Sequence, residues 1–239
     1  MTLAPGLTII VPVYNEQESL DKFQQEMDLF LNAAPMESRV LFVNDGCTDS
    51  SQQIIERIHQ DDSRYHYLVL DQNHGLSTAI KAGIDACTTS LVGYIDADLQ
   101  TSPSDFGQLL TAFPEHDMVN GIRAKRQDKL VKKISSKFAN NFRRLMINDN
   151  IVDTCCPLKI IKTEFAQRLP FFTGMHRFLP ALIQLQGGKV KQMPVSHFPR
   201  YAGQAKYHLF NRLIGPFFDT LAFRWMRSRY IKYGIARQK

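Results

Sequence analysis

The first half of the chain alternates short apolar runs with longer amphipathic stretches. Runs rich in β-forming residues cover positions 7–13, 39–44, 65–70, 91–95 and 118–122. Apolar runs of this length are typical of parallel strands that are covered on both faces. Stretches with helical spacing lie between them, at positions 19–31, 49–59, 76–86 and 104–113. This alternation predicts an α/β sandwich with a mostly parallel central sheet.

Polar motifs close three of these runs. Ligands of open parallel sheets bind beyond the carboxyl ends of the strands, so we expect the site in the loops that follow the runs. The sequence reads PVYNE at 12–16, NDGCTD at 44–49 and DAD at 96–98. Each motif alone also suits a structural turn or a helix cap. Three of them at one edge of a sheet favour a binding site.

The DAD motif carries the strongest chemical signal. Asp96 and Asp98 place two hard oxygen ligands in the expected cleft, which suits Mg²⁺ or Mn²⁺ bridging a diphosphate. Such a metal neutralises the charge that develops on a departing nucleotide diphosphate. Asp45, in the second motif, can accept hydrogen bonds from a nucleobase. The sequence therefore predicts a site for a nucleotide diphosphate and a divalent metal.

Charge divides the chain into two unlike halves. Residues 1–122 carry 5 Lys and Arg against 18 Asp and Glu, whereas residues 123–239 carry 24 against 5. The basic half indicates an anionic partner, which can be a lipid, a phosphate or a nucleic acid. No nucleic-acid-binding motif accompanies the basic residues, and we expect no nucleic-acid partner.

Two segments of the basic half combine apolar and basic residues at helical spacing. They cover positions 128–146 and 209–233, and the second is rich in Phe and Arg and contains Trp225. Both are typical of basic amphipathic helices that lie on an anionic membrane surface. We therefore predict a catalytic domain at 1–208 and a basic aromatic tail at 209–239. The alternative is that the tail packs on its own domain or on a second copy in a homo-oligomer.

Signals for export or for membrane insertion are not found in the sequence. The N-terminal residues lack the basic start and long apolar run of a signal peptide. No run approaches the ~18 apolar residues that a bilayer span requires. The four cysteines show no CxxC spacing, which favours a reducing compartment. We expect a cytoplasmic protein that binds the inner face of the membrane peripherally.

The ordered set of motifs resembles a known family. PVYNE at 12–16, NDGCTDSS at 44–51, NHGLSTAIKAGIDA at 73–86 and DADLQTSP at 96–103 are similar to family-two glycosyltransferases of the GT-A fold. The nearest branch is that of dolichol-phosphate mannose synthases and undecaprenyl-phosphate sugar transferases, and the resemblance extends from position 7 to about 207. Members of that branch often carry C-terminal transmembrane helices, which we do not expect here. The resemblance implies a Rossmann-like three-layer sandwich with basic amphipathic helices at its C-terminal end.

The same resemblance implies a reaction. It is the inverting, metal-dependent transfer of a sugar from a UDP- or GDP-linked donor to a polyprenyl phosphate, at the cytoplasmic face of the membrane during cell-envelope biogenesis. One alternative is a glycosyltransferase with a sugar-hydroxyl acceptor in a cell-surface glycan or a lipid-linked oligosaccharide. A second alternative is a non-catalytic module that binds membrane or nucleic acid.

The resemblance also implies roles for particular residues. The nucleotide sugar would be bound by Pro12, Tyr14, Glu16, Asp45, Asp96 and Gln100. The metal would be held by Asp96, Asp98 and Gln100, with Asp98 also catalytic. The acceptor phosphate would meet Arg123, Lys132 and Ser136, although the family has Arg where Lys132 stands. Arg200 and Lys206, in RYAGQAKY at 200–207, would clamp the leaving diphosphate.

The acceptor decides whether the enzyme needs a general base. A lipid phosphate is already an anion and needs only to be positioned. A sugar hydroxyl needs an Asp, Glu or His at hydrogen-bonding distance. The candidates for that base are Asp153, in DTCCP, and His176, in GMHRF. Neither is a clear base, which favours the polyprenyl-phosphate acceptor.

Overall fold

The computed structural model describes residues 3–123, 146–201 and 214–231. Among them are seven strands of one sheet, in the order β3-β2-β1-β4-β6-β5-β7. β6 is antiparallel to its neighbours β4 and β5, and the remaining neighbours pair in parallel. The strands are β1 (Ala4–Val13), β2 (Ser38–Asn44), β3 (Tyr65–Val69), β4 (Thr89–Tyr94), β5 (Met118–Arg123), β6 (Lys159–Lys162) and β7 (Val190–Val195).

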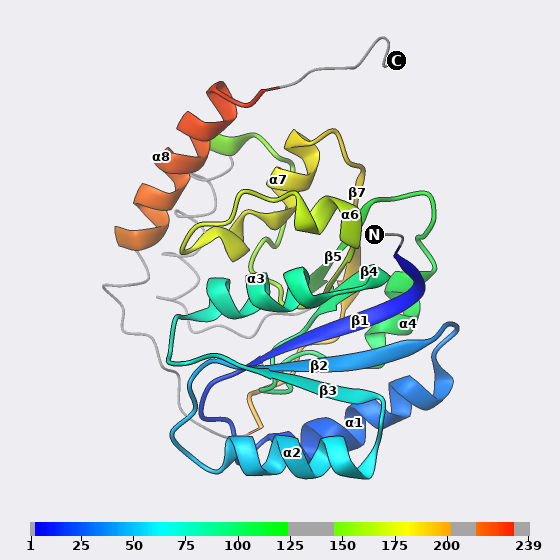
Figure 1. Cartoon of the computed structure of the whole chain (residues 1–239). Coiled ribbons are helices and arrows are strands. Elements are labelled where there is room, and N and C mark those ends of the chain that lie inside the picture. The colour runs from blue at the N-terminus through cyan, green and yellow to red at the C-terminus, as the bar shows by residue number, and fades with distance from the viewer. Residues whose placement is uncertain (1–2, 124–145, 202–213, 232–239) are drawn as a thin grey trace, which may run out of the picture.

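Helices cover both faces of this sheet, which makes the structure a three-layer sandwich (Figure 1). One face packs against α1 (Leu20–Ala33), α2 (Ser51–Asp61) and α4 (Asp105–Leu110). The other face packs against α3 (Leu76–Ala86), α6 (Thr163–Gln167) and α7 (Leu179–Leu185). As Figure 1 shows, the helix α8 (Ile214–Ser228) lies outside this layer, against the short 3₁₀ helix η1 (Met175–Arg177). The predicted α/β fold class is confirmed.

The core explains why the apolar runs form strands. In β1 the residues from position 6 to position 11 are buried, as expected for a strand with helices on both of its faces. Phe42 of β2 stacks on Tyr65 of β3, with ring centroids 5.8 Å apart. Phe30 of α1 meets Phe106 of α4 at 5.5 Å and closes the same layer. Burial of these aromatic side chains stabilises this face, together with the aliphatic residues packed around them.

The C-terminal helix α8 has one face packed on the domain. Phe223 is 1% exposed and stacks on Phe178, with ring centroids 5.4 Å apart. Asp219 of α8 forms an ion pair with Arg177 of η1 at 3.1 Å. None of the described helices is long and apolar enough to cross a membrane. The other basic segment predicted at 128–146 lies almost wholly outside the described residues, and the proposed division at 208 stays a prediction.

Gly46 joins the loops that follow β2 and β3. Its φ is +71°, and a Cβ there would lie 2.4 Å from the Asn73 backbone nitrogen and 2.5 Å from the Gln72 carbonyl carbon. Both neighbours are backbone atoms, so they cannot move aside as a flexible side chain would. Only glycine fits this close approach without moving the chain.

We predict that Gly46→Ala lowers the free energy of unfolding by about 1–3 kcal/mol, because it adds both strain and a steric clash. Gly107→Ala is the matched control. Gly107 lies in α4, and a Cβ added there would meet open space, so this variant should be neutral or more stable by up to about 1 kcal/mol. Urea denaturation of both variants measures the difference, and equal stabilities would contradict the steric argument.

Candidate active site

The candidate site lies where the strands end. β1, β2, β4, β5 and β7 are parallel, so their carboxyl ends meet at one edge of the sheet. β6 runs the other way, and its first residue, Lys159, therefore lies at the same edge. The loops predicted to carry the chemistry are brought together here.

Asp96 and Asp98 follow β4 in a tight turn. The Tyr94 hydroxyl donates to Asp96 Oδ1 at 2.6 Å. The Gln100 backbone N–H donates to Asp98 Oδ1 at 3.1 Å. Leu99 between them has φ +56°, a left-handed conformation that is uncommon outside glycine. The turn therefore holds both carboxylates at the end of a buried strand.

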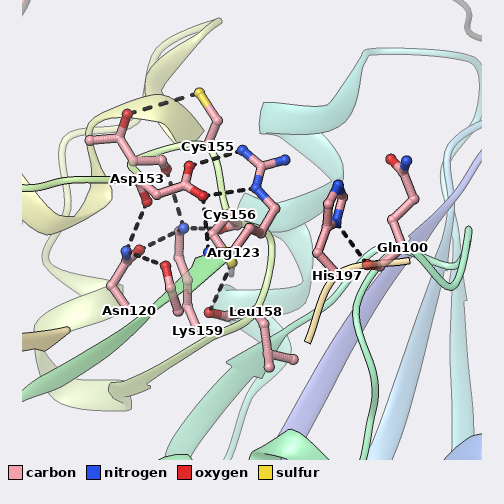
Figure 2. A network of polar contacts seen from close by, with 11 residues as sticks. Gln100, Asn120, Arg123, Asp153, Cys155, Cys156, Leu158, Lys159 and His197 are labelled. Carbon is pink, nitrogen blue, oxygen red and sulfur yellow. Dashed lines mark hydrogen bonds and ion pairs between the residues drawn. The ribbon is translucent and has the colours of Figure 1, made fainter. Parts of the chain in front are cut away.

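Arg200 is brought to this turn by the segment after β7. Arg200 Nη2 lies 2.9 Å from Asp98 Oδ2, and Nη1 lies 3.9 Å from Glu16 Oε1. The His197 ring Nδ1 lies 3.0 Å from the Gln100 carbonyl oxygen, as Figure 2 shows, and the Phe198 N–H donates to the same oxygen at 2.9 Å. Gln100 thus holds the segment after β7 through its backbone carbonyl oxygen.

Burial changes the protonation of the first carboxylate. Desolvation, followed by repulsion from Asp98, raises the pKa of Asp96 to about 6. The hydrogen bond from Tyr94 and the positive charges of Lys159 and Arg200 oppose this rise. A cation bound between the two carboxylates would stabilise their ionised forms.

Asp45 and the loop after β1 lie at the same edge of the sheet as the carboxylate pair. Asp45 is 3% exposed, and its Oδ1 and Oδ2 accept the backbone N–H groups of His74 and Gly75, both at 2.8 Å. In this structure the carboxylate orders the segment before α3, while its predicted contact with a nucleobase stays a prediction. Asn15 Oδ1 accepts the Thr48 N–H at 2.8 Å and ties the loops after β1 and β2 together.

The predicted nucleotide-pocket residues of the first motif lie at the end of β1. Pro12 is the partner of Val43 in the β1–β2 register, and Tyr14 is 36% exposed. The Glu16 backbone N–H donates to Ser51 Oγ at 2.9 Å, which joins this loop to the start of α2. The structure places these residues at the edge that holds Asp96 and Asp98.

Arg123 and Asp153 form a bidentate pair, although they had been predicted to play separate roles. Arg123 Nε lies 2.8 Å from Asp153 Oδ2, and Nη2 lies 2.9 Å from Oδ1 (Figure 2). Burial raises the pKa of the Asp153 carboxyl, but the Arg123 guanidinium outweighs it and brings the pKa below its usual value. A carboxylate held ionised in this way is a weak proton acceptor.

His176, the second candidate base, is partly buried next to the first turn of α3. Its Nδ1 lies 2.7 Å from the Ser77 hydroxyl oxygen, which also accepts the Gly174 N–H at 3.0 Å. Burial lowers the pKa of His176 to about 3, so the ring stays neutral. Its role as a general base stays a prediction, and the observed contacts link η1 to the first turn of α3.

Sequence reasoning missed several residues that build this edge. Tyr94, Asn120 and Lys159 all contact predicted site residues or their neighbours. One signal was available for Lys159, because a lysine inside the apolar run CCPLKII is unusual. Three predicted residues lie outside the described part of the chain: Lys132, Ser136 and Lys206.

The carboxylates fit Mg²⁺ or Mn²⁺. The described residues contain no group of three His, Cys, Asp or Glu side chains that could hold a metal. Mg²⁺ is usually bound by one or two carboxylates, with waters and substrate phosphates as the other ligands. Asp96 and Asp98 match that donor set.

We predict that Tyr94→Phe makes Mn²⁺ binding more sensitive to acid. The variant lacks the hydroxyl that stabilises ionised Asp96, so the pKa of Asp96 rises further and protons compete better with the cation. Its Mn²⁺ affinity should fall below that of the wild type at about pH 6 and match it at about pH 8. Electron paramagnetic resonance of unbound Mn²⁺ measures this, with Tyr67→Phe as the control. An equal loss at both pH values would contradict the explanation.

Comparison with known proteins agrees with this architecture. The structure resembles mannosyl-3-phosphoglycerate synthase from Rubrobacter xylanophilus, with TM-score 0.72 and 16% identity over 99% of this chain and 77% of that one. Glucosyl-3-phosphoglycerate synthase from Mycobacterium tuberculosis was solved in complex with Mn²⁺, UDP and glucosyl-3-phosphoglycerate. It has a TM-score of 0.71 and 12% identity over 97% of this chain and 82% of that one. A mannosyltransferase from Pyrobaculum calidifontis, in complex with GDP-mannose and Mn²⁺, has a TM-score of 0.65 and 16% identity over 98% of this chain and 67% of that one.

At these identities the structural likeness establishes a shared fold. The family evidence comes from the sequence, because the model of the family "Glycosyl transferase family 2" matches residues 8–169 of the 239. That match includes the loops after β1, β2 and β4. The chain therefore belongs to glycosyl transferase family 2 and is a glycosyltransferase.

Proposed function

We propose that the protein transfers a sugar from a nucleotide diphosphate sugar to a polyprenyl phosphate at the cytoplasmic surface of a membrane. The observation that carries this proposal is the separation of charge along one edge of the sheet. Asp96, Asp98 and Glu16 place carboxylates at the ends of β4 and β1. Arg123 and Lys159 place cations at the end of β5 and the start of β6.

The acidic part suits the donor. Asp96 and Asp98 would hold Mg²⁺ or Mn²⁺, with Gln100 beside them. When bound, such a cation supplies positive charge that neutralises the leaving diphosphate. Arg200 already reaches Asp98 and lies near Glu16, so a diphosphate bound here meets a guanidinium. Lys206 is the second predicted cation of this segment. The UDP or GDP in complexes of the similar structures supports a nucleotide donor.

The cationic part suits an acceptor that carries phosphate. A phosphate oxygen attacks the anomeric carbon, the bond to the nucleotide diphosphate breaks, and the configuration inverts. This nucleophile is already an anion and needs no base. The absence of a need for a base agrees with the lowered pKa values of Asp153 and His176, which make both side chains weak proton acceptors. Arg123, with Lys132 and Ser136, would orient the phosphate.

A hydroxyl acceptor is the second candidate. Two of the similar structures are named as synthases of mannosyl- and glucosyl-3-phosphoglycerate, products in which the sugar is joined to a small molecule that also carries phosphate. Both candidates therefore place phosphate near the cationic residues, and they differ in the atom that attacks. With a hydroxyl acceptor, Asp153 or His176 would have to serve as the base.

The outer face of α8 supports attachment to a membrane. Phe218 is 63% exposed and Trp225 is 67% exposed, and both point away from the packed face that carries Phe223. Arg224 within α8 and Arg229 just beyond its last residue are also exposed. Aromatic side chains flanked by arginine suit the interface of an anionic membrane.

Transfer to lipid is expected to require both the lipid and the carboxylates. Purified protein with Mn²⁺ and a panel of UDP- and GDP-sugars should release nucleotide diphosphate only when undecaprenyl or dolichyl phosphate is present, and should form a sugar-linked lipid. Asp98→Asn should lower turnover by about 10²–10³-fold, because it removes a metal ligand. Asp85→Asn, which changes an exposed ion pair on α3, is the matched control. Release with glycan or phosphoglycerate acceptors alone would favour the hydroxyl alternative.

The membrane attachment is tested separately. We expect the double variant Phe218→Ser, Trp225→Ser to bind vesicles containing about one-third anionic lipid at least about tenfold more weakly, because both side chains lose their burial in the interface. Leu29→Ser is the control, since Leu29 is 61% exposed but lies on α1. Equal binding by wild type and double variant in co-sedimentation would contradict the role of α8.

A further inference from the structure

Lys159 is a charged residue inside the protein. It is 1% exposed, and it is among the largest side chains that are fully buried. An ammonium removed from water is stable only when acceptor groups replace the lost hydration. Because β6 is antiparallel to β4 and β5, this ammonium lies at the edge of the sheet that carries the site.

All three donors of the Lys159 ammonium are matched by acceptors. The ammonium donates to Asn120 Oδ1 at 2.8 Å, to the Thr154 carbonyl at 3.2 Å and to the Cys156 carbonyl. The Asn120 amide nitrogen in turn donates to the Asp153 carbonyl at 2.9 Å. Lys159 and Asn120 therefore hold the backbone of the segment 153–156 at three carbonyl groups (Figure 2).

This segment controls the orientation of Arg123. Asp153 receives the Arg123 side chain through two hydrogen bonds, at 2.8 and 2.9 Å, and also accepts the Arg123 backbone N–H at 3.3 Å. Arg123 Nη1 makes no hydrogen bond with the residues that the structure describes. One edge of a fixed guanidinium is thus left to bind a ligand oxygen.

The charge of the cluster favours an anion. Arg123 and Lys159 are positive and Asp153 is negative, so these three side chains carry one excess positive charge. The Arg123 and Asp153 side chains are only 12% and 13% exposed, so solvent screens this charge less than it would at the surface. A phosphate that reaches Arg123 brings negative charge to this excess positive charge.

We infer that Lys159 is a positioning residue for the acceptor phosphate. Together with Asn120 it fixes Asp153, and Asp153 fixes the guanidinium of Arg123 that meets the phosphate. The inference rests on the proposed function in that the phosphate is taken to belong to the acceptor. Lys159 itself touches neither the phosphate nor the sugar.

Measuring the affinity for phosphate tests this role without requiring sugar transfer. The probes are inorganic phosphate and farnesyl phosphate, a short soluble polyprenyl phosphate, each titrated calorimetrically at about pH 8 with Mn²⁺ and excess UDP and GDP filling the donor side. Lys159→Met should weaken binding of both probes about tenfold, while Mn²⁺ affinity should not fall, because the substitution removes a positive charge that acts on Asp96. Lys162→Met is the matched control, because Lys162 ends the same strand and pairs with Asp117 instead.

A double-variant cycle separates positioning from general destabilisation. If Lys159 acts through Arg123, Lys159→Met should weaken phosphate binding no further in an Arg123→Gln background. Asn120→Ala is the second variant, and it should reproduce the loss if Lys159→Met does not fold.

Several results would overturn the inference. They are unchanged phosphate binding in a folded variant, a full additional loss in the Arg123→Gln background, an equal loss of Mn²⁺ affinity, or unfolding of both Lys159→Met and Asn120→Ala. Failure of the proposed function looks different. In that case phosphate binding depends on Lys159 as expected, but no polyprenyl phosphate supports transfer. Tighter binding of farnesyl phosphate than of inorganic phosphate would identify the lipid as the source of the phosphate.

Discussion

Two carboxylates placed one residue apart at the end of a buried strand are the constraint on which the site depends. Burial makes the negative charge of Asp96 less stable, and repulsion from Asp98 adds to this effect. The neighbouring segments supply what this arrangement requires: a hydroxyl from Tyr94, a guanidinium from Arg200 and the more distant ammonium of Lys159. The segment after β7 binds the Gln100 carbonyl and so keeps Arg200 in reach. The active-site edge is therefore organised around negative charge that attracts cations.

The reversed direction of β6 brings a positive charge, that of Lys159, to the edge of the sheet that carries the site. If β6 were parallel to its neighbours, its first residue would lie at the opposite edge of the sheet. Because it is antiparallel, Lys159 lies next to the ends of β4 and β5, where its contacts shape the segment that carries Asp153. Negative and positive groups thus lie side by side along one edge. This division agrees with the reaction proposed above, in which a metal-bound donor meets an anionic acceptor that needs no general base.

Much of the first half could be predicted from the sequence, because its strands are long apolar runs and its loops carry local motifs. Helix α3 begins and ends at the predicted residues 76 and 86, and the motif at 96–98 lies where it was expected. β6 and β7 were missed, since β6 has only four residues and β7, VKQMPV, mixes polar residues with a proline. The pairing of Arg123 with Asp153 was also missed. It joins residues 30 positions apart, and nothing local in either segment indicates the partner.

The most direct test of the account is a crystal structure of the protein grown with Mn²⁺ and a nucleoside diphosphate, with diffraction data collected at the manganese absorption edge. The account predicts an anomalous peak within coordination distance of Asp96 and Asp98, and an Arg200 guanidinium that contacts the diphosphate. A manganese site elsewhere, or a diphosphate bound away from Arg200 with no metal at these carboxylates, would contradict it.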